Sequence, residues 1–161
     1  MVTGHAAEAG RAWAAAAAVL DPEVPVLTID DLGVLRAVSV TDTGVEVVLT
    51  PTYSGCPAMD AIREDVVRAL AAEGFDEVRV SLALAPAWTT DWISDHGRAA
   101  LRDFGIAPPP GTGPVRLTLG VKCPHCDSLK THEVSHFGST ACKALFVCDE
   151  CGEPFDHFKA L

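Results

Sequence analysis

The sequence predicts an α+β fold class: a small mixed sheet backed by helices, followed by a smaller cysteine-rich domain. Three observations lead to this prediction. β-branched runs alternate with helix-favouring segments up to residue 107. A Pro- and Gly-rich stretch then interrupts every hydrophobic period. Four of the six cysteines follow it as two CxxC pairs. We therefore expect an α+β domain at residues 1–107, a linker at 108–113 and a second domain at 114–161.

The first elements follow from local composition. Residues 8–20 are Ala-rich and predict a helix, which the prolines of residues 21–25 end. Residues 34–40 and 45–49 are β-branched runs joined by Thr-Asp-Thr-Gly, a turn composition, so they predict a β-hairpin.

A second helix is expected to begin at Pro57, because proline is favoured at the first helical position. Apolar residues at intervals of three and four give this helix one buried face, formed by Met59, Ile62, Val66 and Leu70. Gly74 ends it, alternation over residues 78–84 predicts a third strand, and a last helix is expected from about residue 91 to 104.

Composition excludes several function classes. The 161 residues carry a net charge of −10, which opposes binding to phosphate backbones, so no nucleic-acid partner is expected. The longest apolar run spans eight residues, Trp13 to Leu20, whereas a membrane span needs about 20. We expect no membrane partner and a cytoplasmic protein, in which thiols stay reduced and cysteines bind metal or react rather than form disulfides.

The two CxxC pairs predict a zinc ribbon. Cys123 and Cys126 are separated by 21 residues from Cys148 and Cys151, and each pair follows β-favouring residues, 117–121 and 145–147. Two intervening residues let both sulfurs of a turn face one metal, whose binding then replaces the core that so small a domain lacks. One structural zinc is expected, with iron as the alternative, since similar ligands hold both. The histidines nearby are expected either at the surface or in contact with the ligand cysteines rather than with the metal itself.

Two cysteines remain outside this pattern. Cys56 is expected at the N-cap of the second helix, where free backbone N–H groups would acidify its thiol; a buried, inert cysteine is the alternative. Cys142 lies between the CxxC pairs, where it could be either a small buried apolar residue or a functional thiol.

Three loops could form one site if the strand ends meet on one side of the sheet. They are the loop of Asp21 and Glu23, the loop 52–56 that leads to Cys56, and the loop 88–92 with Thr89 and Asp91. Thr89 and Asp91 are equally plausible as residues that cap the following helix.

Together the motifs resemble a known family. DPEVP at 21–25, DLG at 31–33, TPTYSGCP at 50–57 and PAWTTDWI at 86–93 are similar to the SufT-like iron–sulfur assembly domain. With FGSTACKAL at 137–145 and a two-knuckle ribbon ending in EPFDHFK at 153–159, the chain resembles the PaaD family. This family is associated, as one of the subunits, with the phenylacetyl-CoA 1,2-epoxidase of phenylacetate degradation.

The resemblance implies an accessory role rather than an enzyme's. The epoxidase system is a di-iron oxygenase with a reductase that carries flavin and an iron–sulfur cluster, and its subunits would be the partners. Maturation of the iron–sulfur or di-iron centre is the implied function, with Cys56 as the functional thiol or transient iron or cluster ligand. Asp21, Glu23, Thr89, Asp91 and Cys142 would support it. A stoichiometric structural subunit is the alternative, and homo-oligomerisation is left open.

Overall fold

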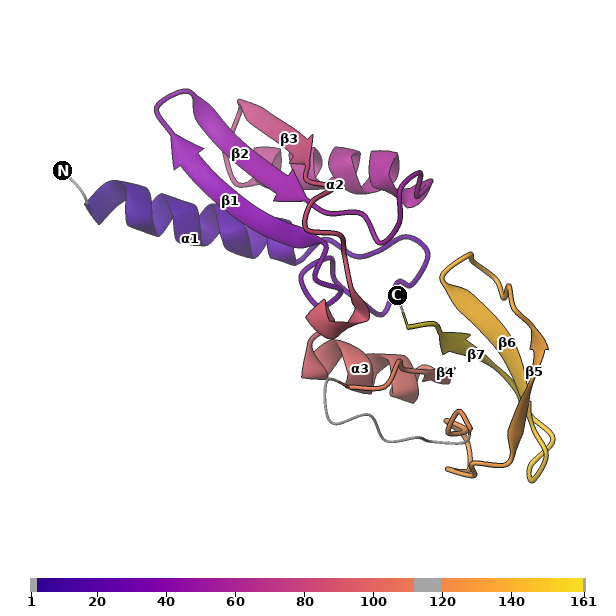
Figure 1. The fold of residues 1–161 in the computed structure, drawn as a ribbon. Helices are drawn as coiled ribbons and strands as arrows, with labels where there is room; N and C mark the ends of the chain where they lie inside the picture. Colours follow the sequence, from indigo (N-terminus) through magenta and orange to yellow (C-terminus); the bar gives the residue numbers. More distant parts are fainter. Residues whose placement is uncertain (1–2, 112–119, 161) are drawn as a thin grey trace. The chain divides into compact units, whose positions relative to one another are not determined.

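The computed structural model describes residues 3–111 and 120–160. The protein divides into two compact units, Met1–Trp88 and Thr89–Leu161 (Figure 1). The division falls before the domain boundary expected at residue 107. The reason is that Ile106–Ala107 forms a short strand, β4, which pairs in parallel with β7 (Pro154–Phe158) of the ribbon. The segment before the Pro-rich stretch is thereby held in the second unit.

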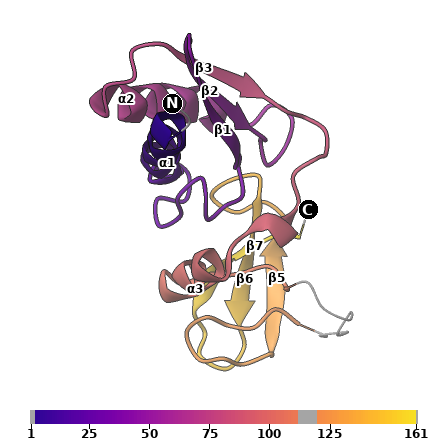
Figure 2. The ribbon, with the colours of Figure 1, turned by 90° about the vertical axis from the view of Figure 1, so that its left-hand side faces the viewer.

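The first unit is a three-stranded mixed sheet with two helices. Its elements in chain order are α1 (Thr3–Ala17), β1 (Leu35–Thr41), β2 (Gly44–Leu49), α2 (Ala58–Ala72) and β3 (Val78–Leu82). The strand order is β1-β2-β3, with β1 and β2 antiparallel and β2 and β3 parallel. Figure 2 shows α1 and α2 on one face of this sheet. The predicted α+β architecture is confirmed.

The core of this unit lies between α2 and the sheet. Val45, Val47 and Leu49 alternate along β2 and are fully or almost fully buried, as expected of a strand covered on one face. The helix buries the face that its periodicity predicts, formed by Met59, Ile62, Val66 and Leu70. Trp88 is the last residue of this unit. Its indole Nε1 donates a 2.8 Å hydrogen bond to the carbonyl of Leu32, which ties the end of the unit to the loop before β1.

The second unit contains a four-stranded sheet in the order β4-β7-β6-β5. Its elements are a 3-10 turn η1 (Thr90–Trp92), α3 (Asp95–Asp103), β4, β5 (Thr131–Ser135), β6 (Lys143–Cys148) and β7. The prediction of a single helix over residues 91–104 is wrong, because the backbone is extended at Ile93 and Ser94 and separates η1 from α3. The Ser94 hydroxyl accepts a 2.9 Å hydrogen bond from the N–H of Gly97, so it caps a new helix there.

Of the two strands expected before the CxxC pairs, the second lies within β6. The first, at residues 117–121, falls largely outside the described residues, and 120–121 are not in a strand. None of the helices described is long and apolar enough to cross a membrane.

Candidate functional site

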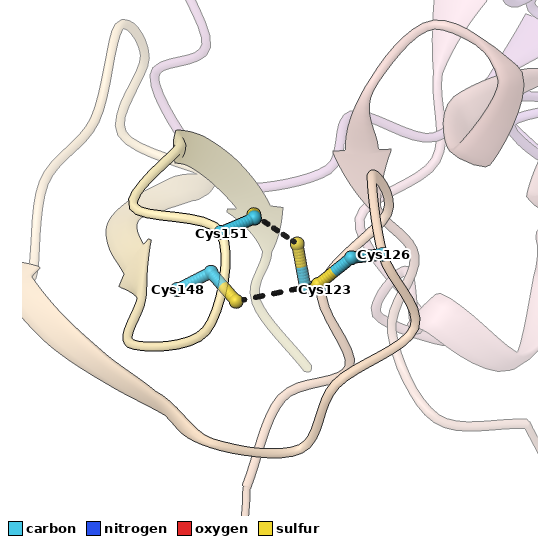
Figure 3. Close-up of side chains that lie close together, drawn as sticks. All are labelled: Cys123, Cys126, Cys148 and Cys151. Atoms are coloured by element: carbon cyan, nitrogen blue, oxygen red, sulfur yellow. Dashed lines mark hydrogen bonds between the residues drawn. The ribbon is translucent and has the colours of Figure 1, made fainter.

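The four cysteines of the CxxC pairs converge on one point. Their sulfur atoms all lie within 4.8 Å of one another (Figure 3). The Sγ atoms of Cys123 and Cys151 are 3.9 Å apart, and those of Cys126 and Cys148 are 3.5 Å apart. Zn–S bonds of about 2.3 Å in a tetrahedron would place the sulfurs about 3.8 Å apart. The donor set and its spacing therefore fit a single four-coordinate metal ion.

Tight turns hold each pair in place. The N–H of Asp127 donates to the carbonyl of Cys123 at 2.9 Å, and Asp127 takes the left-handed conformation with φ 65°. In the second turn the N–H of Gly152 donates to the carbonyl of Cys148 at 2.9 Å, with φ 76° at Gly152. Because glycine adopts positive φ without strain, Gly152 suits this turn better than Asp127 suits the first.

The pKa values of the clustered thiols move in opposite directions. The N–H groups of Cys151 and Glu150 lower the pKa of Cys148 to about 7. The N–H of Ser128 also lowers that of Cys126, but hydrogen bonds to the neighbouring sulfurs oppose it and the pKa of Cys126 rises to about 12. Four clustered thiols cannot all ionise without a cation between them, and a divalent ion removes that conflict.

Two of the ligands belong to a small hydrophobic cluster of the ribbon. Cys123 and Cys148 are fully buried, and with Ala107 and Phe155 they form one small cluster, against which Val121 and Phe146 pack. Cys126 and Cys151 are exposed. Two sulfurs thus occupy the interior of the unit, and a bound metal would stabilise the fold directly.

The histidines of the ribbon make other contacts. The Nδ1 atom of His132 lies 2.8 Å from a carboxylate oxygen of Asp149, and that of His136 lies 3.5 Å from Glu133. Nδ1 of His157 lies 3.2 Å from the carbonyl oxygen of Ala107, and burial lowers the pKa of His157.

Cys56 lies in the first unit, in the loop before α2. The predicted N-cap position is wrong: Pro57 occupies it, and α2 begins at Ala58. The predicted acidification is wrong as well. Burial raises the pKa of the Cys56 thiol, the N–H of Ala58 and the side chain of Thr52 lower it, and the charges of Glu23 and Asp21 raise it further. The thiol is half-buried next to negative charges, which disfavour the thiolate.

Residues of two predicted loops act on Cys56: the side chain of Thr52 hydrogen-bonds to its thiol, and the charges of Asp21 and Glu23 influence it. Asp21 is buried, and its Oδ1 accepts 2.8 Å hydrogen bonds from the N–H groups of Glu23 and Val24. The Asp21 carboxylate thereby fixes the backbone turn that carries Glu23. Thr52 belongs to the predicted loop 52–56, and the contact of its side chain with the Cys56 thiol is seen only in the structure.

The third predicted loop, 88–92, crosses the division between the units, and its Thr89 and Asp91 belong to the second unit. The Thr89 hydroxyl accepts a 3.0 Å hydrogen bond from the N–H of Asp91 and so caps η1. Thr89 thus has the capping role that the sequence allowed, whereas Asp91 lies within η1 and Ser94 caps α3. A part for Thr89 and Asp91 in a site with Cys56 stays a prediction.

Cys142 is buried just before β6 and is not one of the four clustered cysteines. Its Sγ lies 3.0 Å from the hydroxyl oxygen of Thr140, and its carbonyl accepts a 3.0 Å hydrogen bond from the N–H of Lys159. Sequence reasoning missed its neighbour Lys143, a buried cation 3.4 Å from Asp156. A lysine next to the apolar run 144–147 was the available signal.

Comparison with known proteins connects both units to one family. Residues 11–89 match the family model of an iron–sulfur cluster assembly protein, and residues 107–159 match the PaaD zinc beta ribbon domain. A protein of Escherichia coli strain K12, provisionally named as a subunit of 1,2-phenylacetyl-CoA epoxidase, is 49% identical over 150 residues, which cover 92% of this chain and 91% of that protein. The chain belongs to the PaaD family.

Two further relatives match only part of this chain and at lower identity. An Fe-S protein maturation auxiliary factor of Porphyromonas gingivalis is 38% identical over 85 residues, or 52% of this chain and 80% of that protein. The crystal structure of a domain of unknown function, DUF59, from Bacillus anthracis superposes with a TM-score of 0.58 at 26% identity, covering 63% of this chain and 97% of that one.

Proposed function

We propose that this protein is an accessory maturation component of the phenylacetyl-CoA epoxidase system in phenylacetate catabolism. In this proposal Cys56 holds iron or an iron–sulfur cluster transiently on its way to a client subunit, and the protein itself does not oxidise substrate. The observation that carries the proposal is the position of Cys56, half-buried beside Asp21, Glu23 and Thr52, in a domain whose family model is an iron–sulfur cluster assembly protein.

The chemistry of this group favours a metal cargo over a thiol enzyme. A nucleophilic cysteine needs a lowered pKa or an adjacent base, whereas burial and carboxylates raise the pKa of Cys56. A cation reverses these effects, because it displaces the thiol proton and is attracted by Asp21 and Glu23. A thiolate sulfur is a ligand that iron accepts, and the charges of Asp21 and Glu23 favour a cation at the Cys56 thiol. A site with few protein ligands also suits transient binding.

The ribbon has a different task in this proposal. Cys123, Cys126, Cys148 and Cys151 would hold one zinc ion, with iron as the alternative occupant. Four thiolates leave no open coordination position, so the metal supplies folding energy rather than catalysis. We assign the ribbon to docking on a partner of the oxygenase or reductase.

A stoichiometric subunit without metal transfer is the second candidate. The observation that favours it is the name of the relative from Escherichia coli, which assigns that protein to the epoxidase as a subunit. In that case Cys56 would be dispensable and the chain would co-purify with the oxygenase at fixed stoichiometry.

The variant Cys56→Ser separates the two candidates. Co-expressed with the oxygenase and reductase, it should lower their iron or cluster content and the epoxidase activity, while its own zinc content stays normal because Cys56 is not one of the four clustered cysteines. Asp42→Asn, an exposed change in the turn between β1 and β2, serves as the control and should leave cluster content unchanged. Normal cluster content and activity with Cys56→Ser would exclude the carrier role.

Metal analysis tests the ribbon independently. We expect about one zinc per chain, and a strong chelator should abolish amide protection in β6 and β7 while β1 and β2 of the first unit keep theirs. Well under one metal ion per chain, or a ribbon indifferent to the chelator, would contradict the assignment.

A further inference from the structure

The strand β3 forms one edge of the sheet in the first unit. It pairs with β2 on one side, and no strand of the described residues pairs with its other side (Figure 1). An edge strand presents backbone N–H and C=O groups that can pair with another chain. β3 is therefore a place where an extended segment could be added to the sheet.

The hydrogen bonds around β3 identify the outward groups. The N–H of Ala83 donates to the carbonyl of Leu49, and the carbonyl of Glu77 accepts from the N–H of Val45, so both residues direct their backbone groups toward β2. Alternate residues of a strand point their groups to the same side. Val78, Val80 and Leu82 consequently direct theirs to the open edge.

An open groove lies at one point of this edge, where Val80 of β3 meets α2. It has a volume of about 440 Å³ and lies between α2 and β3, with a floor formed by Val67 and Val80. Val67 is 41% exposed, and Leu82 at the end of β3 is 40% exposed. Arginine and glutamate side chains form the walls, at positions 63, 64 and 68. The shape suits a strand with one apolar side chain turned into the floor.

One wall residue already contacts the edge. The Nη2 atom of Arg63 donates to the outward carbonyl of Val80 at 3.3 Å, a long hydrogen bond from a charged donor. An incoming backbone N–H can replace this donor at the carbonyl, and the guanidinium is then available to a carboxylate of the same segment.

Charge favours an acidic occupant. The first unit has thirteen acidic residues, no lysine and only five arginines. Three of the five lie at this edge: Arg63 and Arg68 in the groove and Arg79 on β3. Arg68 and Arg79 are exposed and each pairs with one exposed carboxylate, Asp65 and Glu46, while Glu64 is the one acidic group in the groove wall. The three arginines offset these three carboxylates, whereas the remainder of the unit has ten acidic residues and two arginines, so the β3 edge is where this unit repels an acidic segment least.

We propose that the β3 edge is a docking site for an extended segment of a partner protein that alternates apolar and acidic side chains. The segment adds to the sheet as a fourth strand, places an apolar side chain over Val67 and Val80, and places carboxylates next to Arg63 and Arg68. This surface is separate from the ribbon cysteines, and its use does not depend on the role of Cys56.

A defined peptide tests this assignment on the full-length chain. The probe is the capped peptide Glu-Val-Glu-Val-Glu-Val-Glu, titrated against isotope-labelled, zinc-loaded protein and followed by amide chemical shifts and hydrogen exchange. We expect the outward amides of Val78, Val80 and Leu82 to gain protection, while the amides of Arg79 and Ser81, already directed to β2, change little. The matching Lys-Val peptide should bind about tenfold more weakly or not at all.

Two variants complete the test. Arg63→Glu combined with Arg68→Glu should reverse the preference to the Lys-Val peptide, whereas Arg36→Glu on the opposite edge strand β1 should leave the original preference in place. Absence of shifts at β3 and α2, shifts located elsewhere, or equal binding of the two peptides would overturn the proposal. None of these outcomes bears on metal transfer, which Cys56→Ser tests separately.

Discussion

The pair of Lys143 and Asp156 in the ribbon gives a prediction whose size follows from burial. Lys143 Nζ lies 3.4 Å from Asp156 Oδ2, and the two side chains are 6% and 22% exposed. The Ser139 hydroxyl donates a 2.9 Å hydrogen bond to the same carboxylate oxygen. The lysine is therefore the more deeply buried partner, and the carboxylate is the one with further support.

The two single substitutions should differ because of this asymmetry. Asp156→Asn leaves a buried ammonium without its counter-charge, and removal of one partner of a buried pair costs about 3–5 kcal/mol. Because Asp156 is 22% exposed, water reaches the site, so we expect about 3 kcal/mol, the lower end of that range. Lys143→Met removes the buried charge itself and leaves a carboxylate that still accepts from Ser139, so about 1 kcal/mol is expected.

Hydrogen exchange of the β6 and β7 amides in the zinc-loaded chain measures these costs, since a single unfolding midpoint is not defined for a chain of two units. The double variant should cost about as much as Lys143→Met alone, which means a coupling energy of about 2–3 kcal/mol. Glu46→Gln, in an exposed pair with Arg79, is the control and should change β2 protection by less than about 0.5 kcal/mol. A smaller cost for Asp156→Asn than for Lys143→Met would refute the reasoning.

Three further predictions concern single positions. Trp88→Phe removes the 2.8 Å hydrogen bond to Leu32 at a site only 5% exposed and should destabilise the first unit by about 1–3 kcal/mol, measured by amide exchange in β2, with the more exposed Trp13→Phe costing less. Glu23→Gln removes a negative charge that raises the pKa of Cys56, so this pKa should fall and alkylation of the thiol at neutral pH should accelerate. Asp42→Asn in the β1–β2 turn is the control and should leave the alkylation rate unchanged. Slower alkylation of the Glu23→Gln variant would contradict the electrostatic argument. Gly105→Ala places a residue with a Cβ at φ 87°, 3.3 Å from His125 Cε1, and should destabilise the second unit by about 1–2 kcal/mol. Gly10→Ala in α1, where a Cβ meets nothing within 4 Å, should instead stabilise the first unit by about 0.5–1 kcal/mol. Similar effects at both positions, measured by amide exchange, would show that backbone strain and crowding at Gly105 are not the cause.

Local patterns predicted the first unit well and the second less well. The period of α2 names the residues that are buried, because side-chain direction follows from secondary structure alone. The break between η1 and α3 was missed, because Ser94 competes as a helix cap with a helical pattern that continues through it. β4 was missed for another reason: two residues before a Pro-rich stretch become a strand only by pairing with β7, about fifty positions later.

The candidate sites divide in the same way. The spacing of the CxxC pairs by itself predicted which four sulfurs converge, since two residues between cysteines form a turn that aims both at one point. Sequence also placed Cys56 in the loop before α2. Only the tertiary structure decided that its thiol pKa is raised rather than lowered, that Asp21 and Glu23 stand beside it, and that Lys143 is a buried cation. The physical reason is that turns are set by neighbours along the chain, whereas desolvation and charge interactions depend on distances through space between residues far apart in sequence.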